Sequence, residues 1–279
     1  MQQVSEIESA KEIIDESDAL LITAGAGMGV DSGLPDFRGT EGFWREYPVL
    51  KKLGYRFEYM ANPKWFEENP KLAWAFYGHR LNLYRKTKPH KGFSLLLQLA
   101  RKKGDDYFVY TSNVDGQFQK AGFDPEKIAE IHGSIHHLQC HIPCTKDIWS
   151  AQKIPDIPID MERFEALEIP KCIHCDAVAR PNILMFADYS WISSRSDMQE
   201  RRFEKWLEEV QKNNKRLAIV EIGAGIAIPS IRHAGEAIAS SFSNATLIRI
   251  NPRESDIDPS LGISLSLGGL EALERIVAV

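Results

Sequence analysis

The chain has 279 residues, of which 43% are hydrophobic and 26% are charged, and these proportions exclude a disordered or collagen-like protein. The formal net charge of −5 argues against a general nucleic-acid-binding protein, which usually has a basic excess. No apolar run is long enough to span a membrane, and the polar, acidic start of the chain lacks the pattern of a signal peptide. We therefore expect a cytoplasmic protein that binds neither membranes nor nucleic acids directly.

Expected helices and buried strands alternate along the chain. Short continuous apolar runs are typical of strands buried in a parallel sheet, and they occur at 19–23, 107–111, 217–222, 246–250 and 263–267. Apolar spacing predicts helices near 5–16, 92–103, 197–213, 228–241 and 269–277. This alternation predicts an α/β fold with a doubly wound, Rossmann-like parallel sheet.

Two segments interrupt the alternation. Residues 40–87 are rich in aromatic side chains and are expected to be helical, whereas residues 138–178 hold all four cysteines and show little periodicity. We interpret both as insertions that pack together as a small zinc-ribbon and helical domain. The Rossmann-like domain would then consist of residues 1–39, 88–137 and 179–279.

The cysteines form two closely spaced pairs, which predicts a structural zinc site. Disulfides are disfavoured in a chain without an export signal, and four thiolates complete a tetrahedron without an open position for catalysis. Four free buried thiols are the alternative, and the neighbouring His141 and His174 are interpreted as bystanders. The expected zinc ligands are Cys140, Cys144, Cys172 and Cys175.

Glycine-rich or polar residues follow three of the expected strands. The sequence Gly-Ala-Gly occurs at 25–27 and again at 223–225, and an asparagine directly follows the strand at 246–250. A single motif of this kind is often a plain turn, but three such strand ends would line the crevice in which open α/β sheets bind dinucleotides. No acidic residue stands in the usual ribose position, so this is not an ordinary dehydrogenase fingerprint. The cofactor-binding candidates here are Gly25, Ala26, Gly27, Gly223, Ala224, Gly225 and Asn251.

Three further polar clusters lie beside these strand ends. The first ends in Asp36, Phe37 and Arg38, the second contains Ser112, Asn113 and Asp115, and the third contains His132 before a glycine. Short polar side chains at a strand end are suitable helix caps as well as ribose ligands, and a histidine there can be a general base. Each cluster alone favours a surface turn or a cap, whereas their common order favours a site.

In that order, the motifs resemble the sirtuin family of NAD-dependent protein lysine deacylases, of bacterial type. The stretches that carry the resemblance are 25–28, 32–38, 113–115, 132–133, the four cysteines, 180–186 and 250–251. The resemblance implies a Rossmann-type domain, a small zinc domain, and a cleft between them for NAD and an acyl-lysine. It also implies that nicotinamide, free lysine and O-acyl-ADP-ribose are the products.

The resemblance implies roles for individual residues. His132 would be the general base, with Asn113 and Asp115 as further catalytic residues that hold the nicotinamide ribose and carboxamide. The acyl-lysine peptide would lie as an added strand between residues 186–188 and 225–227. Its expected contacts are Ile183, Phe186, Ala187 and Asp188. The remaining histidines, His79, His90, His136, His137 and His233, are expected to fill surface or core positions.

Tyr77 and Arg80 stand three residues apart on one expected helix face, and this pair resembles the sirtuin class that removes malonyl and succinyl groups. A guanidinium binds a carboxylate in bidentate fashion, and a tyrosine hydroxyl adds a third contact. The alternative is a core tyrosine beside an exposed arginine.

The chain departs from the family pattern at several positions. Gly29, Ser112, Ala224 and Gly225 replace residues with longer polar side chains, which puts NAD affinity in question, and Ala187-Asp188 replaces Gly-Glu in the peptide strand. Two competing functions therefore stay open. One is NAD cleavage without a peptide, as in an NAD glycohydrolase or mono-ADP-ribosyltransferase, and the other is a module that senses NAD or ADP-ribose.

Overall fold

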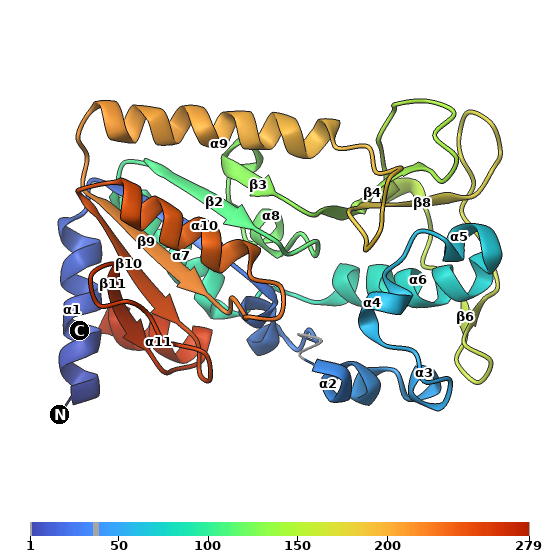
Figure 1. Ribbon diagram of the computed structural model, residues 1–279, viewed down its shortest axis with the longest axis horizontal. Helices are drawn as coiled ribbons and strands as arrows, with labels where there is room; N and C mark the ends of the chain where they lie inside the picture. Colours follow the sequence, from blue (N-terminus) through green and yellow to red (C-terminus); the bar gives the residue numbers. More distant parts are fainter. Residues whose placement is uncertain (1, 36–38, 279) are drawn as a thin grey trace.

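The computed structural model describes residues 2–35 and 39–278, which form two modules side by side (Figure 1). The larger module is built on a six-stranded parallel sheet with the order β11-β10-β9-β1-β2-β3. Its strands are β1 (Ala19–Ala24), β2 (Tyr107–Thr111), β3 (Ile128–Glu130), β9 (Leu217–Ile222), β10 (Ala245–Ile250) and β11 (Gly262–Leu265). All five strands expected from the sequence are present, and the α/β class is confirmed.

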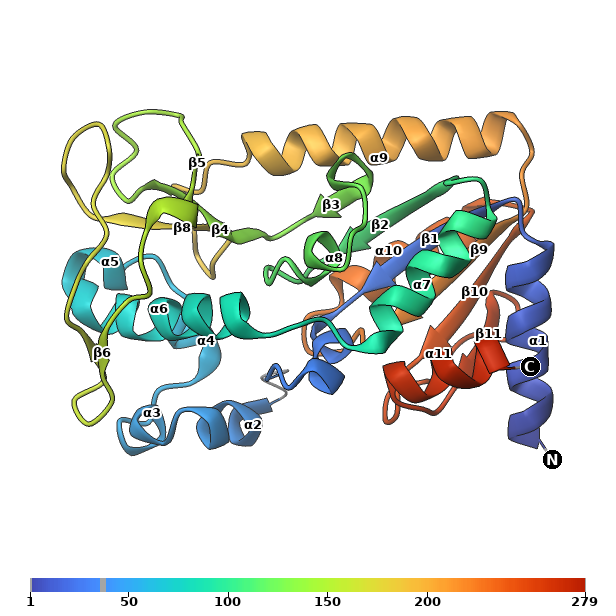
Figure 2. The ribbon, with the colours of Figure 1, turned by 180° about the vertical axis from the view of Figure 1, so that it is seen from behind.

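Helices cover both faces of this sheet, as a comparison of Figures 1 and 2 shows. The helices on one face are α1 (Gln2–Glu16), α7 (Lys91–Lys102) and α11 (Gly269–Ala278). Those on the other are α9 (Ser194–Lys212) and α10 (Ser230–Ser241). Every residue of β1 and β9 is buried, which explains why these strands are mainly apolar rather than alternating. The buried polar exceptions are Thr23 and Glu221, and Glu221 forms an ion pair with Arg249 of β10. The shorter helical elements of this module are η1 (Ala26–Ser32), α8 (Gln117–Lys120) and η2 (Pro125–Lys127).

The strand order creates a switch point at the centre of the sheet. From β1 the chain adds β2 and β3 on one side, and it later adds β9, β10 and β11 on the other. β1 and β9 are therefore neighbours, and their last residues, Ala24 and Ile222, are partners in register. Ligands of open α/β sheets bind at the carboxyl ends of the strands at such a point.

The small module combines a helical segment with a second sheet. The helices are α2 (Gly39–Glu46), α3 (Pro48–Lys52), α4 (Phe57–Met60), α5 (Trp65–Glu68) and α6 (Pro70–Lys86). The antiparallel elements are β4 (Gly133–Cys140), β5 (Trp149–Ser150), β6 (Ile159–Asp160), β7 (Glu165–Ala166) and β8 (Ala179–Ile183), with η3 (Ala151–Lys153) after β5. Aromatic side chains of the helices and apolar residues of the sheet share one core.

The expected domain limits differ from the strand limits at two places. The expected boundary at residue 179 assigns β8 to the Rossmann-like domain, although β8 pairs with β4 in the sheet of the small module. The boundary between residues 137 and 138 falls inside β4, because this strand begins at Gly133 and pairs with β8. The helical segment expected over 40–87 ends close to the end of α6, and α6 begins with an Asn69 cap that accepts from Leu72 N–H at 3.1 Å. Residues 2–35 and 39–278 contain no helix that is long and apolar enough to cross a membrane.

Candidate active site

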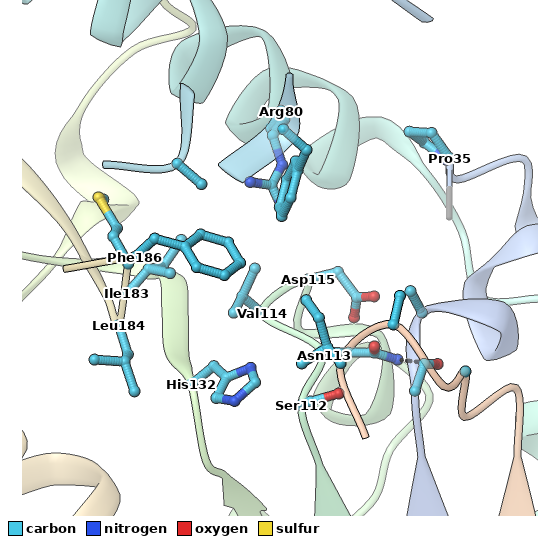
Figure 3. A pocket seen from close by; sticks show the side chains of 18 of the residues that line it. Pro35, Arg80, Ser112, Asn113, Val114, Asp115, His132, Ile183, Leu184 and Phe186 are labelled. Carbon is cyan, nitrogen blue, oxygen red and sulfur yellow. Dashed lines mark hydrogen bonds between the residues drawn. The ribbon is translucent and has the colours of Figure 1, made fainter. Parts of the chain in front are cut away.

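A cavity of about 700 Å³ lies where the carboxyl ends of the sheet strands meet the small module (Figure 3). Its lining comes from the ends of β1, β2 and β9, the β3–β4 turn, α4, α6 and the segment after β8. This volume is within the range of about 300–1,000 Å³ that is usual for ligand pockets. The expected site residues that line it are Gly25, Ala26, Tyr77, Arg80, Ser112, Asn113, Asp115, His132, Ile183, Phe186, Ala187, Gly223, Ala224 and Gly225.

The two glycine-rich strand ends are packed directly on each other. Gly25 N–H donates to the Ile222 carbonyl and Gly27 N–H to the Gly223 carbonyl, both at 3.0 Å. A Cβ atom on Gly25 would lie 2.7 Å from the Gly223 oxygen, and one on Gly223 would lie 2.4 Å from the backbone of Gly27. Gly223 also has φ of 64°, a conformation that favours glycine. These glycines therefore allow the two loops to meet. Gly27 belongs to this contact and is not among the residues that line the cavity.

Asn251 also lies outside the cavity lining. Its buried amide donates to the Ala224 carbonyl at 2.9 Å and accepts from the N–H groups of Arg253 and Glu254 at 3.1 and 3.0 Å. The role of Asn251 in cofactor binding stays a prediction, because its side-chain amide is bonded to neighbouring backbone groups in this structure. A polar residue at a strand end here fastens the loop after β9 to the loop after β10.

Asn113 and Asp115 follow β2 and both line the cavity, with Asp115 the more deeply buried of the two. The Asn113 amide donates to the Gly25 carbonyl at 2.9 Å, drawn as the dashed line in Figure 3. Asp115 is only 8% exposed, and one carboxylate oxygen accepts from Gln117 N–H at 2.8 Å. Burial, with a smaller contribution from the nearby Glu130, raises the pKa of Asp115 to about 6. This carboxyl group is thus close to changing its charge at physiological pH.

His132 follows β3 and points its ring into the cavity (Figure 3). Burial lowers the pKa of His132 below its ordinary value of 6.5, so the imidazole is neutral at pH 7. Its ring has no hydrogen-bond partner within residues 2–35 and 39–278. The next residue must be glycine, since Gly133 has φ of 79° and a Cβ atom there would lie 2.1 Å from the Asn182 carbonyl oxygen.

Tyr77 and Arg80 line the cavity from α6 and are 1% and 6% exposed. Arg80 Nε donates to the Tyr84 hydroxyl at 3.1 Å, and its guanidinium carbon lies 5.3–5.6 Å from the ring centroids of Phe76, Tyr77 and Tyr84. Burial raises the pKa of Tyr77, so its hydroxyl stays protonated. The alternative of an exposed arginine is excluded, because both groups face the cavity from within the core.

The segment after β8 forms the opposite rim. Phe186 N–H donates to the Ala61 carbonyl at 2.8 Å, and Ala187 has φ of 53°, which is unusual for a residue with a Cβ atom. Asp188 does not reach the cavity. Its side chain is 0% exposed, and its carboxylate accepts hydrogen bonds from the two terminal guanidinium nitrogens of Arg180, at 2.7 and 2.9 Å. The Asp188 carboxylate therefore holds this segment from inside, and the expected contact of Asp188 with the peptide, as part of an added strand, stays a prediction.

The four expected zinc ligands lie together in the small module. Their Sγ atoms are within 4.8 Å of one another, and the Cys140–Cys175 and Cys144–Cys172 pairs are both separated by 3.7 Å. A tetrahedral zinc ion with Zn–S bonds of about 2.3 Å requires Sγ separations of about 3.8 Å. The thiol set therefore fits zinc. His174 Nε2 lies 2.9 Å from an Asp147 carboxylate oxygen, in agreement with its interpretation as a bystander.

Three expected residues, Asp36, Phe37 and Arg38, lie outside the described residues. The motifs also missed residues that line the cavity, such as Phe57 and Glu58 of α4. These side chains belong to no recognisable spacing, so the sequence carried no signal for them. His136 does not line the cavity, and its Nε2 donates to the Asp115 backbone carbonyl at 2.8 Å. A contact of this kind, between a side chain and the backbone behind the site, has no motif in the sequence.

Comparison with known proteins assigns the family. A family model described as SIR2, Sir2 family, matches residues 25–230. The chain belongs to the Sir2 family. Among Sir2 relatives, the NAD-dependent protein deacylase of Leptospira interrogans is 28% identical over 263 residues, which cover 94% of this chain and 93% of the relative. That of Aquifex aeolicus is 28% identical over 239 residues, or 85% of each chain.

Solved Sir2 structures have the same fold. A Sir2 homologue in complex with NAD gives a TM-score of 0.70 at 24% identity, with 96% of this chain and 91% of that chain covered. A Sir2 complex with a deacetylated peptide gives a TM-score of 0.66 at 20% identity, with 96% of each chain covered. The Rossmann-like sheet with an added small module is thus the fold of Sir2 structures.

Proposed function

We infer that this Sir2 family member is an NAD-dependent protein lysine deacylase. The observation that carries the inference is that a neutral His132 and the Asn113 amide share one cavity at the switch point of a parallel sheet. Relatives that align over most of their length are named NAD-dependent protein deacylases. A nucleotide-sensing module is disfavoured, since it has no need of a buried neutral base.

NAD would be held along the sheet side of the cavity. Gly25, Ala26 and the loop at 223–225 present backbone where a pyrophosphate can approach closely, as glycine-rich strand ends do. Their backbone groups would replace the side-chain hydrogen bonds that the departures at Ala224 and Gly225 remove. When bound, NAD supplies a ribose whose anomeric carbon accepts the acyl oxygen as nicotinamide leaves.

His132 would serve as the general base. Its imidazole is neutral at pH 7 and has no competing partner among the described residues, so a ring nitrogen is available to take a proton from a ribose hydroxyl. Asn113, fixed by its bond to Gly25, and the buried Asp115 would orient the ribose and carboxamide. A positioned base of this kind contributes about 10²–10⁴-fold to a rate.

The acyl-lysine would enter between the segment after β8 and the loop at 225–227. Ile183, Phe186 and Ala187 line this entrance, and the solved Sir2 relative with a deacetylated peptide supports a peptide in it. Arg80 and Tyr77 would then meet the far end of the acyl group. A buried guanidinium beside a protonated tyrosine suits a carboxylate, which favours malonyl and succinyl groups in addition to acetyl.

Mass spectrometry of NAD incubated with acetyl-, malonyl- and succinyl-lysine peptides tests the proposal. We expect O-acyl-ADP-ribose and nicotinamide only when a peptide is present, with the acidic acyl groups removed at least as fast as acetyl. ADP-ribose formed at the same rate without peptide would instead indicate an NAD glycohydrolase. The observation that motivated that alternative, the altered Ala187-Asp188 sequence, is accounted for by the internal Arg180–Asp188 pair. A cytoplasmic location and the absence of direct nucleic-acid binding stay predictions.

A further inference from the structure

His90, expected to fill a surface or core position, joins α7 to the glycine-rich loop at 25–32. Its backbone N–H donates to Ser32 Oγ at 3.0 Å, and its Nε2 lies 2.9 Å from the Met28 carbonyl oxygen. Gly92 N–H lies 3.0 Å from His90 Nδ1. The residue therefore contacts both the first turn of α7 and the middle of the loop.

These contacts define the protonation of the ring. A carbonyl oxygen only accepts, so Nε2 carries the proton and donates to Met28, while Nδ1 carries none and accepts from Gly92. One neutral tautomer satisfies both bonds. The Phe93 ring packs edge-on against the imidazole at 4.9 Å, and a Cβ atom on Gly92 would lie 2.5 Å from His90 Cε1. The imidazole is thus fixed in orientation as well as in tautomer.

The loop needs such external support. It contains three glycines and forms a 3₁₀ helix, whose hydrogen bonds are poorer than those of an α-helix. Within the described part of the chain, two side chains donate to carbonyl groups of this loop. Asn113 bonds Gly25 from the cavity side, and His90 bonds Met28 from outside the cavity lining.

We propose that His90 is a positioning residue for cofactor binding, whose imidazole holds residues 25–32 so that Gly25 and Ala26 face the cavity. The proposal rests on the proposed function, because it takes this loop to be the binding surface for NAD. His90 does not line the cavity, so it acts through the loop backbone. Its loss therefore weakens the binding of NAD more than the binding of the peptide or the chemical step.

Two substitutions separate the two ring nitrogens. His90→Asn keeps an acceptor near the position of Nδ1, so it still caps α7, but its amide is too short to reach the Met28 carbonyl. His90→Gln keeps a donor near the position of Nε2 and loses the cap. Ser94→Ala, at an exposed position on the same helix, is the control.

We expect His90→Asn to raise the KM for NAD about three- to tenfold, the effect of one lost hydrogen bond, with kcat, the peptide KM and Tm close to wild type. His90→Gln should keep the KM for NAD and lower Tm, and Ser94→Ala should change neither. An unchanged KM for NAD in His90→Asn would overturn the proposal. Equal rises in both KM values together with a lower Tm would also overturn it, since they would make His90 merely structural.

Calorimetric titration with ADP-ribose keeps this test separate from that of the proposed function. Weaker ADP-ribose binding to His90→Asn, in a protein that deacylates no peptide, would support the role of His90 and overturn the proposed function. Wild-type binding to an active His90→Asn variant would overturn the role of His90 alone. A wild-type protein that does not bind ADP-ribose would overturn both.

Discussion

The two sides of the cavity are held in place by different kinds of contact. On the sheet side, the loops after β1 and β9 touch backbone to backbone at Gly25 and Gly223, and neighbouring side chains bond to their carbonyl groups. On the small-module side, the rim depends on a buried side-chain ion pair, Arg180–Asp188, and on a single backbone bond from Phe186 to Ala61.

This difference matches the different roles of the two sides, chemistry and cofactor binding on one side and substrate binding on the other. Groups that need exact placement for chemistry stand at the ends of parallel strands, where the sheet fixes the backbone. Groups that meet the acyl chain and peptide stand on α6 and on a segment whose position depends on a few pairs. Substitutions on the sheet side should therefore change cofactor binding or the rate, whereas those on the small-module side should change substrate choice or stability.

The largest effect is expected from His132→Ala, which should lower kcat by about 10²–10⁴-fold. NAD binding should be preserved, because the His132 ring has no hydrogen-bond partner in the described part of the chain that its removal would leave unpaired. Steady-state kinetics and calorimetry measure the two quantities. His233→Ala, at an exposed position on α10, is the matched control. Deacylation at the wild-type rate in His132→Ala would remove this residue from the mechanism.

Asp188→Asn should destabilise the protein by about 3–5 kcal/mol, because it leaves the buried Arg180 guanidinium without its counter-charge. Denaturant unfolding gives this value, and the KM for peptide should rise more than that for NAD. The double variant Arg180→Met/Asp188→Leu removes both charges and should recover part of the stability. If Asp188→Asn unfolds at the wild-type midpoint, the pair does not hold the segment.

Asp115→Asn should stabilise the protein at pH 7.5 while lowering activity. The folded pKa of about 6 is raised above the ordinary value of 3.8, so the favourable contribution of Asp115 is present below pH 3.8 and is lost as the pH rises through 6. The difference corresponds to about 3 kcal/mol at pH 7.5. Thermal unfolding between pH 4 and 7.5 should show the advantage of the variant shrinking on acidification. Glu208→Gln, exposed on α9, should show no such trend.

The smallest effect is expected from Ala187→Gly. Relief of the left-handed conformation is worth about 1–2 kcal/mol and is partly offset by the greater freedom of glycine in the unfolded chain. A net gain of about 0.5–1 kcal/mol should appear as a higher Tm. Ala227→Gly, across the cavity at a residue without a positive φ, should not be stabilising. A lower Tm for Ala187→Gly would show that its Cβ contacts outweigh the backbone strain.

The same difference between the two sides explains what the sequence could predict. The central strands β1, β2 and β9 are almost wholly buried, so each appears as a mainly apolar run, and the strand-end motifs at 25–27, 113–115 and 223–225 come after them. β3 is too short for a pattern to be recognised. β4 and β8 carry buried polar residues, including Gln139 and Asn182, whose amides bond to each other at 2.9 Å, so neither strand has an apolar signature.

The polar side chains beside the motifs show the same limit. Asp188 and Asn251 stand within or next to recognisable motifs, yet their polar atoms are occupied by Arg180 and by backbone groups of neighbouring loops. His90 and His136 belong to no motif, and only the three-dimensional structure shows that each bonds to the backbone of a cavity-lining segment. A motif identifies which residues gather at a strand end, but not which of them face the ligand.

The most direct test of these different roles is the ratio of desuccinylation to deacetylation in Arg80→Met relative to wild type. We predict that the ratio of the kcat/KM values falls about 10- to 100-fold, the effect of losing a charge-assisted bond to a carboxylate, while deacetylation stays within about threefold. Arg85→Met, the same substitution on the same helix but outside the cavity lining, should leave the ratio unchanged. Equal losses on both substrates in Arg80→Met would contradict the account, because Arg80 would then support the fold rather than select the acyl group.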